Sequence, residues 1–481
     1  MKKNLLIIAV LTMFFLTGCG QKANNTVSIA VFPDSVVSDV SNHPVGINLN
    51  FIMDGGRFPN AQTNVAQAVK KMGTKYLRYP GGEKSDLYLF SIPPYEKSHT
   101  TLARTVGLED YPGVFKEGDF VYDPLDFDEF MQICKETGAE PVLVVAADNY
   151  LRKPGEGERV SSREELIKHA VEWVRYANIK KKYNVRYWMI GNESWNNNNE
   201  NSTIDIYAQD VIDFSKAMKA VDPSILVIPN GDSEDFFKTV ITKAGDYIDR
   251  LCVSNYGVFD FNAGYESYKD TTRCLIWPAQ TALNAMNKYA TPEQLAKWKL
   301  IVAEYGTIDW AGLWHGTNDM GHAIVNFDMT GQLLSEPQIE FSCFWNTRWL
   351  NNEEQSQTDH DAIDPNGNIN PTGYSLLIWN KFMGEKMVRS ESKGRIISYA
   401  SYSLQKGRLF VYLINKGDGQ ENIHITIPGG NEAEVIQCWE YFGQDDKDTA
   451  PVWQQRELKE DDISLKKYSI TVVEYQLEDK R

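Results

Sequence analysis

The stretch Tyr187-Trp188-Met189-Ile190-Gly191-Asn192-Glu193 decides the fold, together with its counterpart Leu300-Ile301-Val302-Ala303-Glu304-Tyr305-Gly306. Each begins as a short continuous apolar run, which is typical of a strand buried on both faces of a parallel sheet. In each, a glutamate follows the apolar run at the point where such a strand passes into a loop. We therefore expect Glu193 and Glu304 at the carboxyl ends of two parallel strands.

Six further apolar runs alternate with helical segments between about residues 44 and 380. One helical segment has Val65, Ala68, Val69 and Met72 on one face and stops at Gly73, a residue type common just after a helix. The expected strands lie at 45–49, 75–78, 141–146, 187–190, 225–229, 251–256, 300–304 and 341–345. Eight strands separated by helices predict an α/β fold, a closed (β/α)8 TIM barrel over residues 41–382.

The sequence pattern changes after about residue 383. Short alternating runs at 395–403, 409–414, 423–427, 435–441 and 468–475 are separated by Gly, Asn and Asp turns. This pattern predicts a C-terminal antiparallel β-sandwich domain over residues 383–481. Residues 19–40 are expected to form a tether, with a candidate strand from Val27 to Phe32 that would join the sandwich.

The first 18 residues have the features of a signal peptide. Lys2 and Lys3 precede an apolar stretch from Leu5 to Leu16 that is short for a membrane span. The following Leu16-Thr17-Gly18-Cys19 resembles a bacterial lipoprotein processing box, which implies lipidation of Cys19. We expect export and anchoring to a bacterial membrane through this lipid only, facing the periplasm or the cell surface. The alternative is an ordinary signal peptide with a chance cysteine.

Charge and residue spacing exclude several classes of partner and cofactor. A formal charge of -16 over 481 residues opposes nucleic-acid binding, because phosphate recognition requires a basic face. The other cysteines, Cys134, Cys252, Cys274, Cys343 and Cys438, lack metal-ligand spacing and read as mostly buried thiols, with a Cys252–Cys274 disulfide left open. The histidines show no HExxH motif or paired spacing, and no phosphate loop or dinucleotide fingerprint is present. We therefore expect no catalytic metal and no cofactor.

Two carboxylates at one rim of a barrel are the minimum equipment for cleaving a glycosidic bond. In a retaining enzyme they lie about 5–5.5 Å apart. One is protonated and donates its proton to the leaving oxygen, whereas the other is ionised and attacks the sugar carbon. The surroundings of each carboxyl group decide which role it takes.

Several motifs resemble those of the large clan of retaining glycoside hydrolases with α/β barrels. Gly191-Asn192-Glu193 at the end of the fourth strand is similar to the acid/base motif of that clan, and Glu304, three strands later, to its nucleophile. The resemblance implies that Asn192 binds the 2-hydroxyl of the substrate and that Tyr256 donates a hydrogen bond to the nucleophile. It also implies that Arg78 keeps Glu304 ionised; a simple ion pair with an acidic neighbour is the alternative.

Position along the expected strands suggests further lining residues. Asp148 and Asn149 follow the third strand and are candidates for the wall of a sugar site. Trp345 and Arg348 follow the eighth strand and are candidates for its floor, with core packing as the alternative for Trp345. The turn Pro80-Gly81-Gly82 would let a sugar approach the backbone closely.

Within the clan, Tyr76-Leu77-Arg78-Tyr79-Pro80-Gly81-Gly82 and Asn370-Pro371-Thr372-Gly373-Tyr374 are similar to segments of α-L-arabinofuranosidases. The extension Glu83-Lys84-Ser85-Asp86 also resembles the heparanase and β-glucuronidase family. The segment Gly46-Ile47-Asn48-Leu49-Asn50 departs from the arabinofuranosidase pattern, because the glutamate expected after the first strand is missing.

These resemblances imply a retaining glycoside hydrolase that acts on plant or algal polysaccharide or oligosaccharide, with arabinofuranosidase-like specificity. A uronic-acid glycosidase and an endo-acting glycanase are the enzymatic alternatives. A surface glycan-binding lipoprotein without catalytic activity is the alternative of another class.

Overall fold

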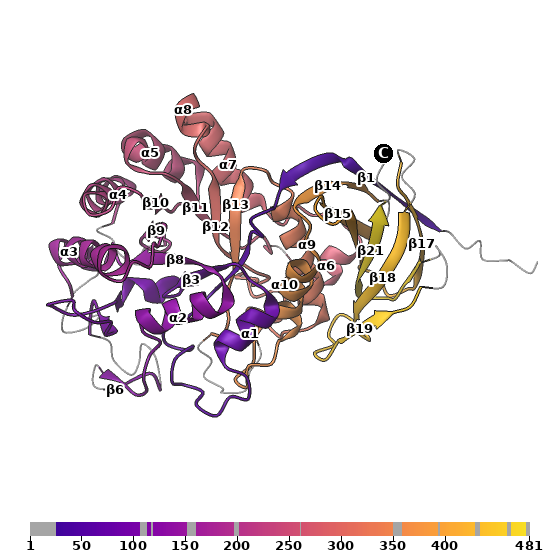
Figure 1. Cartoon of the computed structure of the whole chain (residues 1–481), viewed down its shortest axis with the longest axis horizontal. Helices are drawn as coiled ribbons and strands as arrows, with labels where there is room; N and C mark the ends of the chain where they lie inside the picture. The colour runs from indigo at the N-terminus through magenta and orange to yellow at the C-terminus, as the bar shows by residue number, and fades with distance from the viewer. Residues whose placement is uncertain are drawn as a thin grey trace, which may run out of the picture.

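The computed structural model describes residues 26–105, 113–116, 119–151, 160–196, 202–259, 261–349, 358–392, 395–428, 433–458 and 463–477. They form a barrel and a large β-sheet domain that lie side by side (Figure 1). The expected signal peptide and Cys19 lie outside the described residues. Within the described part, no helix combines the length and apolar content needed to cross a bilayer.

The barrel contains eight parallel strands in the order β10-β9-β8-β3-β2-β13-β12-β11. An isolated parallel bridge between Asn230 and Cys252 lies where the ends of this order, β10 and β11, meet. The expected TIM barrel is thereby confirmed. The strands are β2 (Val45–Asn48), β3 (Tyr76–Tyr79), β8 (Glu140–Val145), β9 (Tyr187–Ile190), β10 (Leu226–Pro229), β11 (Leu251–Asn255), β12 (Leu300–Tyr305) and β13 (Ile339–Phe344).

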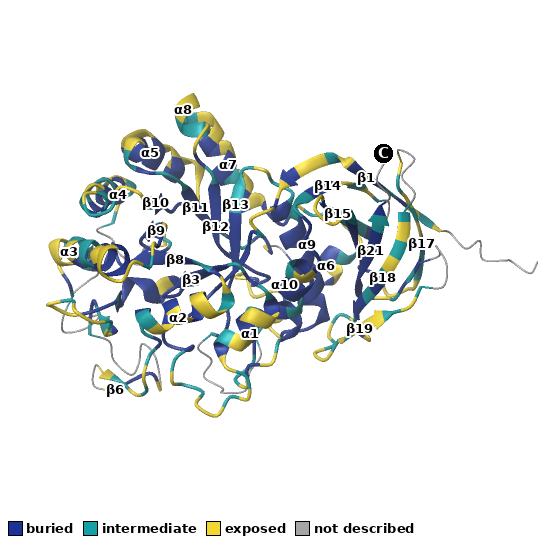
Figure 2. Cartoon of the chain, in the orientation of Figure 1, coloured by how far each residue is buried: buried dark blue, intermediate teal, exposed yellow. Residues whose placement is uncertain are grey.

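Helices surround the barrel and turn their buried sides toward it (Figure 2). They are α1 (Val65–Met72), α2 (Phe127–Thr137), α3 (Arg163–Val174), α4 (Ile204–Lys219), α5 (Glu234–Ala244), α6 (Glu266–Lys269), α7 (Trp277–Tyr289), α8 (Pro292–Leu295), α9 (Met320–Leu334) and α10 (Pro371–Phe382). Helix α1 begins with a capping box formed by Asn64 and Gln67, and it ends at Gly73, whose φ is 75°. Only a residue that tolerates a positive φ closes a helix in this way at low cost.

Side chains that point inward fill the barrel. They form a separate buried cluster that contains Tyr76, Val142, Val144, Tyr187, Met189, Ile228, Cys252, Ile301, Ala303, Phe341 and Cys343. On β8, Val142 and Val144 belong to this cluster, whereas Leu143 and Val145 join the core that packs against the helices. This two-residue alternation places every second side chain of a strand inside the barrel.

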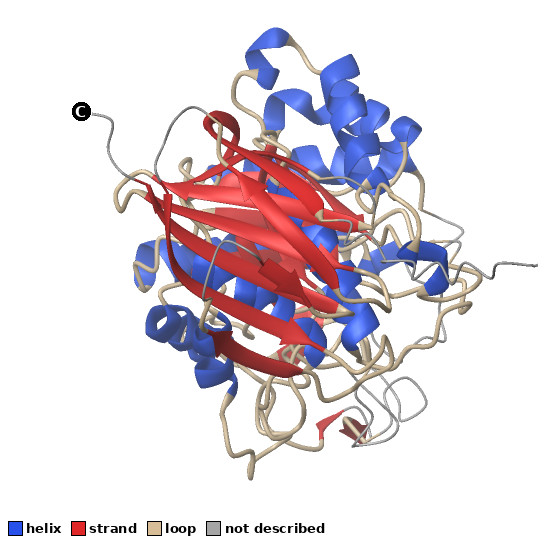
Figure 3. Cartoon of the chain, turned by 90° about the vertical axis from the view of Figure 1, so that its right-hand side faces the viewer, coloured by secondary structure: helices blue, strands red, loops and turns tan. Residues whose placement is uncertain are grey.

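The second domain is built on a nine-stranded sheet in the order β19-β18-β21-β16-β15-β14-β1-β17-β20. Neighbouring strands are antiparallel except for β1 and β17. Strands from both ends of this order contribute to one buried cluster, as expected for a sheet folded into a sandwich (Figure 3). The strands are β1 (Val27–Asp39), β14 (Lys386–Glu391), β15 (Ile396–Ser403), β16 (Arg408–Asn415), β17 (Glu421–Thr426), β18 (Ala433–Phe442), β19 (Val452–Arg456), β20 (Ile463–Leu465) and β21 (Ser469–Leu477).

Several elements were not expected from the sequence. Strands β14, β19 and β20 are additions to the predicted sandwich. After β3, the chain forms two small hairpins, β4 (Tyr88–Leu89) with β5 (Thr101–Leu102) and β6 (Phe115–Lys116) with β7 (Asp119–Phe120). Cys252 and Cys274 are both free thiols, so the structure does not form the disulfide that the sequence left open.

Candidate active site

Glu304 lies near the carboxyl end of β12, next to an irregularity in the sheet. Val302 pairs with Val253 of β11, but the next pair is Glu304 with Ser254, so Ala303 is an extra residue. Such a β-bulge changes the direction of the side chains that follow it. Glu304 therefore meets residues of the barrel interior and is 4% exposed, whereas the hydroxyl of Tyr305 bonds to Thr330 of α9.

Asn48, on β2, supports this bulge. Its amide nitrogen donates to the carbonyl oxygen of Ala303 at 2.9 Å. Its amide oxygen accepts a hydrogen bond from Nη1 of Arg78 at 2.8 Å. The hydrogen-bonding groups of this buried polar side chain are thus satisfied, because both the nitrogen and the oxygen of its amide have partners.

Arg78, on β3, links the segment that carries Glu193 to the segment that carries Glu304. Its Nη1 lies 2.9 Å from Oε1 of Glu304, and its Nη2 donates to Oδ1 of Asn192 at 2.6 Å. The side chain is 2% exposed, so these interactions are shielded from water. The acidic neighbour of Arg78 is Glu304 itself, so the ion-pair alternative and the supporting role describe the same contact.

Tyr256 lies just after β11 and supplies a second donor to Glu304. Its hydroxyl is 2.7 Å from Oε2, the oxygen that Arg78 does not contact. Each carboxylate oxygen of Glu304 therefore accepts a hydrogen bond. One of these donors is a charged guanidinium, the stronger kind of hydrogen-bond donor.

Glu193 lies in a tight turn directly after β9. Gly191 and Glu193 have positive φ angles of 69° and 45°, a region that costs a residue with a side chain about 1–2 kcal/mol. Asn230 holds this turn together. It accepts from the backbone nitrogen of Ser194 at 3.0 Å and donates to the carbonyl oxygens of Ile190 and Gly191 at 3.1 and 3.2 Å.

The surroundings of Glu193 favour its protonated form. Burial, then the negative charge of Glu304 and, to a smaller extent, that of Glu83 raise the pKa of Glu193 to about 8; a hydrogen bond from Ser254 and the positive charge of Arg78 act in the opposite direction. Glu193 follows β9 and Glu304 lies near the end of β12, so both are at the carboxyl rim of the barrel. One carboxyl with donors on both oxygens and one held protonated is the combination that divides a nucleophile from an acid.

The other predicted residues take different positions. Asn192 is buried, and its Nδ2 has no hydrogen-bond partner among the described residues, which leaves a donor for a ligand. Asn149, after β8, is fully buried, and neither its Nδ2 nor its Oδ1 has a hydrogen-bond partner among the described residues. Asp148 is also buried beside it. Buried polar atoms of this kind are expected to be paired when a polar ligand binds.

Trp345 packs over the glycine turn that follows β3. A Cβ atom added to Gly82 would lie 2.2 Å from Cη2 of Trp345, and the φ of Gly82 is 51°, so two constraints require glycine here. Arg348, by contrast, contacts a different set of residues from Trp345. Its Nη2 is 3.1 Å from Oδ1 of Asp54, and its guanidinium lies 4.7 Å from the ring centre of Phe58, so these contacts hold it beside Asp54 and not beside the glutamates.

Lys84 is a residue that sequence reasoning missed. It is 2% exposed, and its Nζ lies 3.3 Å from the ring centre of Trp349. Burial lowers the pKa of Lys84 to about 8, against the charges of Glu83 and Glu304, which raise it. Asn48, Asn230 and Ser254 were missed as well. A polar residue inside an apolar run was the available signal for Asn48 and, more weakly, for Ser254 in the run at 251–256.

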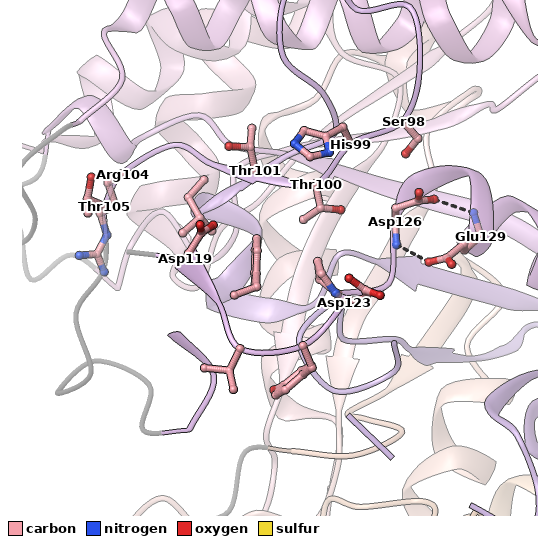
Figure 4. Close-up of a pocket in the computed structure, with 15 residues that line it drawn as sticks. Ser98, His99, Thr100, Thr101, Arg104, Thr105, Asp119, Asp123, Asp126 and Glu129 are labelled. Atoms are coloured by element: carbon pink, nitrogen blue, oxygen red, sulfur yellow. Dashed lines mark hydrogen bonds between the residues drawn. The ribbon is translucent and has the colours of Figure 1, made fainter. Parts of the chain in front are cut away.

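A cavity of about 620 Å³ lies apart from these residues, between the β4–β5 hairpin, β7 and the start of α2. Figure 4 shows polar groups around it, including the reciprocal hydrogen bonds of Asp126 and Glu129 that cap α2. None of the predicted site residues lines this cavity.

Comparison with known proteins gives the geometry a context. Residues 68–273 match the family model of the Alpha-L-arabinofuranosidase 1 domain. The chain resembles arabinofuranosidase-type glycoside hydrolases. The resemblance expected from the motifs is thereby confirmed. The matched segment contains Arg78, Asn192, Glu193 and Tyr256, whereas Glu304 lies beyond it.

Curated relatives have related descriptions. A probable α-L-arabinofuranosidase C from Aspergillus niger is 29% identical over 185 residues, which are 34% of this chain and 31% of the relative. An intracellular exo-α-(1→5)-L-arabinofuranosidase from Acetivibrio thermocellus is 25% identical over 247 residues, 44% of this chain and 43% of the relative. The aligned part thus spans about a third of the length of the first of these relatives.

Solved structures share the fold over almost the whole chain. The α-L-arabinofuranosidase from Thermotoga maritima, in complex with arabinose, has a TM-score of 0.69 at 19% identity, covering 93% of this chain and 99% of its own. A family 44 xyloglucanase from Paenibacillus polymyxa has a TM-score of 0.62 at 13% identity, covering 94% and 99%. At such identities the likeness establishes the fold, a barrel joined to a β-sandwich.

Proposed function

We propose that the chain is a retaining glycoside hydrolase that releases α-L-arabinofuranosyl groups from plant or algal polysaccharides or oligosaccharides. The observation that carries the proposal is the pair of glutamates at one rim with opposite surroundings. Arg78 and Tyr256 donate to both oxygens of Glu304, whereas burial and the charge of Glu304 keep Glu193 protonated near neutral pH.

In the first step, an oxygen of Glu304 attacks the anomeric carbon and the glycosidic bond breaks. Glu193 gives its proton to the departing oxygen, so that the leaving group departs as an alcohol and the sugar stays bound as an ester of Glu304. In the second step, the now ionised Glu193 takes a proton from water. The water oxygen attacks the anomeric carbon, and Glu304 leaves as a carboxylate.

Substrate position depends on the donors near the pair. Asn192 is fixed by its bond to Arg78, and its Nδ2 remains for the 2-hydroxyl of the sugar. Since Arg78 also holds Glu304, one guanidinium would set the distance between the nucleophile and the group that orients the sugar.

The test compares wild type with Glu304→Ala and Glu193→Gln on aryl glycosides and polysaccharides. We expect arabinose release by wild type and a loss of several orders of magnitude in Glu304→Ala. Azide should restore turnover of Glu304→Ala and give a glycosyl azide of inverted anomeric configuration. Retained glycan binding without any sugar release by wild type would favour the alternative of a glycan-binding lipoprotein. Loss of polymer viscosity before sugar release would favour the endo-acting alternative.

A second candidate is a uronic-acid glycosidase, and buried Lys84 is the observation that favours it. A cation held in a largely dehydrated position near Glu304 would bind the carboxylate of an acidic sugar strongly. Activity on aryl β-D-glucuronide above that on aryl α-L-arabinofuranoside, lost in Lys84→Met, would support this candidate. The opposite preference, unchanged in Lys84→Met, would eliminate it.

We also propose that the protein is exported and anchored by a lipid on Cys19. The support is the order of charged, apolar and small residues before Cys19. Metabolic labelling with radioactive palmitate in a bacterial host should mark wild type and not Cys19→Ala. Equal labelling of both would contradict the proposal.

A further inference from the structure

Three residues at the start of α9 form a cluster outside the catalytic machinery. His315, Asp319 and His322 each offer a ligand atom, and these atoms lie within 4.8 Å of one another. Asp319 caps the helix by accepting from the backbone nitrogen of His322 at 3.0 Å. That cap uses only Oδ1. The other oxygen, Oδ2, has no hydrogen-bond partner among the described residues, although Asp319 is only 1% exposed.

The spacing of these atoms suits a transition-metal ion. Nε2 of His315 lies 3.4 Å from Oδ2 of Asp319. Two ligand atoms at about 2.0–2.1 Å from a tetrahedral zinc ion are separated by about 3.3–3.4 Å. The unpartnered oxygen and the imidazole nitrogen therefore already have the separation that a shared ion would impose.

His322 supplies the third position and is held from three sides. Its Nδ1 is 2.7 Å from Oδ1 of Asp319, and its ring stacks on Trp314 with centroids 3.6 Å apart. Its Nε2 faces Oδ2 of Asp359 at 3.8 Å and has no hydrogen-bond partner among the described residues. A metal-bound histidine commonly directs its second nitrogen at a carboxylate, which fixes the tautomer and the ring orientation.

We propose that Nε2 of His315, Oδ2 of Asp319 and Nδ1 of His322 bind one Zn²⁺ or a similar divalent transition-metal ion, which replaces the proton that Nδ1 of His322 shares with Oδ1 of Asp319; the imidazole keeps its other proton, on Nε2. Water completes the coordination from the side of His315, whose side chain is 38% exposed. Asp359 accepts the Nε2 proton of His322. Two imidazoles and one carboxylate favour Zn²⁺ over Mg²⁺ or Ca²⁺, which take oxygen ligands. The sequence analysis expects no catalytic metal. The ion proposed here has a structural role, so it does not conflict with that expectation.

The site would fix the loop that follows the Glu304 strand. This loop, residues 306–319, carries Trp310, whose ring lies edge-on to Tyr256 at 5.5 Å. Hydrogen bonds attach it to the segment 358–361. The backbone nitrogen of Asp359 donates to the carbonyl oxygen of Gly316 at 2.9 Å, and Nδ2 of Asn318 donates to the carbonyl oxygens of Thr358 and Asp361, each at 2.8 Å. A bound ion would join the same two segments more strongly, because its ligand His315 lies in the loop and its ligand His322 is oriented by Asp359 of the other segment.

The test uses the whole protein, treated with EDTA, dialysed and titrated with ZnCl2 in a calorimeter, with bound metal counted by plasma mass spectrometry. We expect one Zn²⁺ per chain and a higher unfolding temperature, since a ligand that binds only the folded state stabilises it. His315→Ala should lose the binding, and because this residue is partly exposed the variant should still fold. Asp359→Asn should weaken binding about 10–100-fold.

His424→Ala is the matched control, because His424 is exposed on β17 and far from the cluster in the fold. It should bind Zn²⁺ as wild type does. Wild type that takes up no stoichiometric Zn²⁺, or a His315→Ala variant that binds as tightly as wild type, would overturn the proposal. Both readouts are independent of glycosidase activity, so the metal site and the proposed reaction stand or fall separately.

Discussion

The two glutamates reach the same rim of the barrel through different backbone irregularities. Glu193 lies in a left-handed turn closed by Asn230, whereas Glu304 follows a β-bulge supported by Asn48. In both cases an asparagine bonds to backbone groups at the irregularity: Asn230 follows β10, the neighbour of β9, and Asn48 reaches Ala303 from β2, two strands away from β12. A regular strand would alternate its side chains between barrel interior and helices, so an irregularity is a direct way to re-aim one of them.

The two glutamates differ most in the groups that surround each carboxyl. Glu304 has a buried guanidinium and a hydroxyl on its two oxygens. Glu193 has Ser254 as a side-chain hydrogen-bond donor and the negative charge of Glu304 nearby. Two chemically identical residues therefore have opposite surroundings, and the roles proposed for them depend on that difference. Substitution of Glu193, or of a residue that contacts either glutamate, tests those roles.

The largest effect is expected when the acid is removed. Glu193→Gln should lower kcat on an oligosaccharide by about 10²–10⁴-fold, because a poor leaving group needs its proton. The loss in the glycosylation step should be much smaller on a 4-nitrophenyl glycoside, whose leaving group is stable as an anion. Steady-state and pre-steady-state rates on both substrates measure the difference. Glu340→Gln is the control, since Glu340 lies at the amino end of β13 and bonds to Tyr187. Equal losses on the two substrates would argue against an acid role.

The buried ion pair gives the next effect. Arg78→Met leaves the charge of Glu304 buried and uncompensated, which should cost about 3–5 kcal/mol of stability. The double variant Arg78→Met/Glu304→Gln should recover part of this loss, because the unpaired charge is gone. Urea midpoints followed by tryptophan fluorescence measure both. Arg389→Met, on an exposed pair with Glu391, should cost about 1 kcal/mol or less. No recovery in the double variant would show that Arg78 acts by packing alone.

Removal of the second donor to Glu304 should have a smaller effect. Tyr256→Phe deletes a hydrogen bond to a charged group, worth about 1.5–3 kcal/mol, and should lower kcat/KM by about 10–150-fold. Tyr305→Phe is the control on the same strand as Glu304, because its hydroxyl contacts Thr330 instead. Rates that match between the two variants would contradict a specific role for the Tyr256 hydroxyl.

The smallest effect concerns the pH profile. Glu193 must be protonated for the first step, so kcat/KM should fall as pH rises through about 8. The bond from Ser254 favours the ionised form of Glu193, so Ser254→Ala should raise the pKa further and move the falling limb to higher pH. A shift of this limb to lower pH, in initial rates measured between neutral and alkaline pH, would contradict the assignment.

The barrel strands could be predicted because a strand buried on both faces is a continuous apolar run that needs no partner to be recognised. Val45–Asn48 and Leu251–Asn255 lie within a residue or two of the expected ranges. The bulge at Ala303 could not be predicted, since it exists only in the register between β12 and β11. Asn48 could be noticed as a polar residue in an apolar run, but its role could not be predicted because it depends on that bulge.

The sandwich was predicted less completely for a related reason. Strand β19 is Val452–Arg456, mostly polar and largely exposed, and β20 spans only three residues. Such edge strands are defined by the neighbour that they pair with rather than by an apolar pattern of their own. Lys84 was quoted only as part of a motif, because a lysine between Glu83 and Ser85-Asp86 is typical of a solvated surface, and only the fold places it against Trp349.

Strand β1 gives the molecule an unusual dependence on the order of its synthesis. It precedes the barrel in the chain, yet it pairs with β14 and β17, which follow the barrel. During translation β1 would leave the ribosome several hundred residues before either neighbour exists, and an unpaired strand edge invites association with other chains. The sheet of the second domain can therefore be completed only after the barrel has been synthesised. A fragment that contains the barrel alone should begin after Asp39, because an unpaired β1 strand would expose its edge to other molecules.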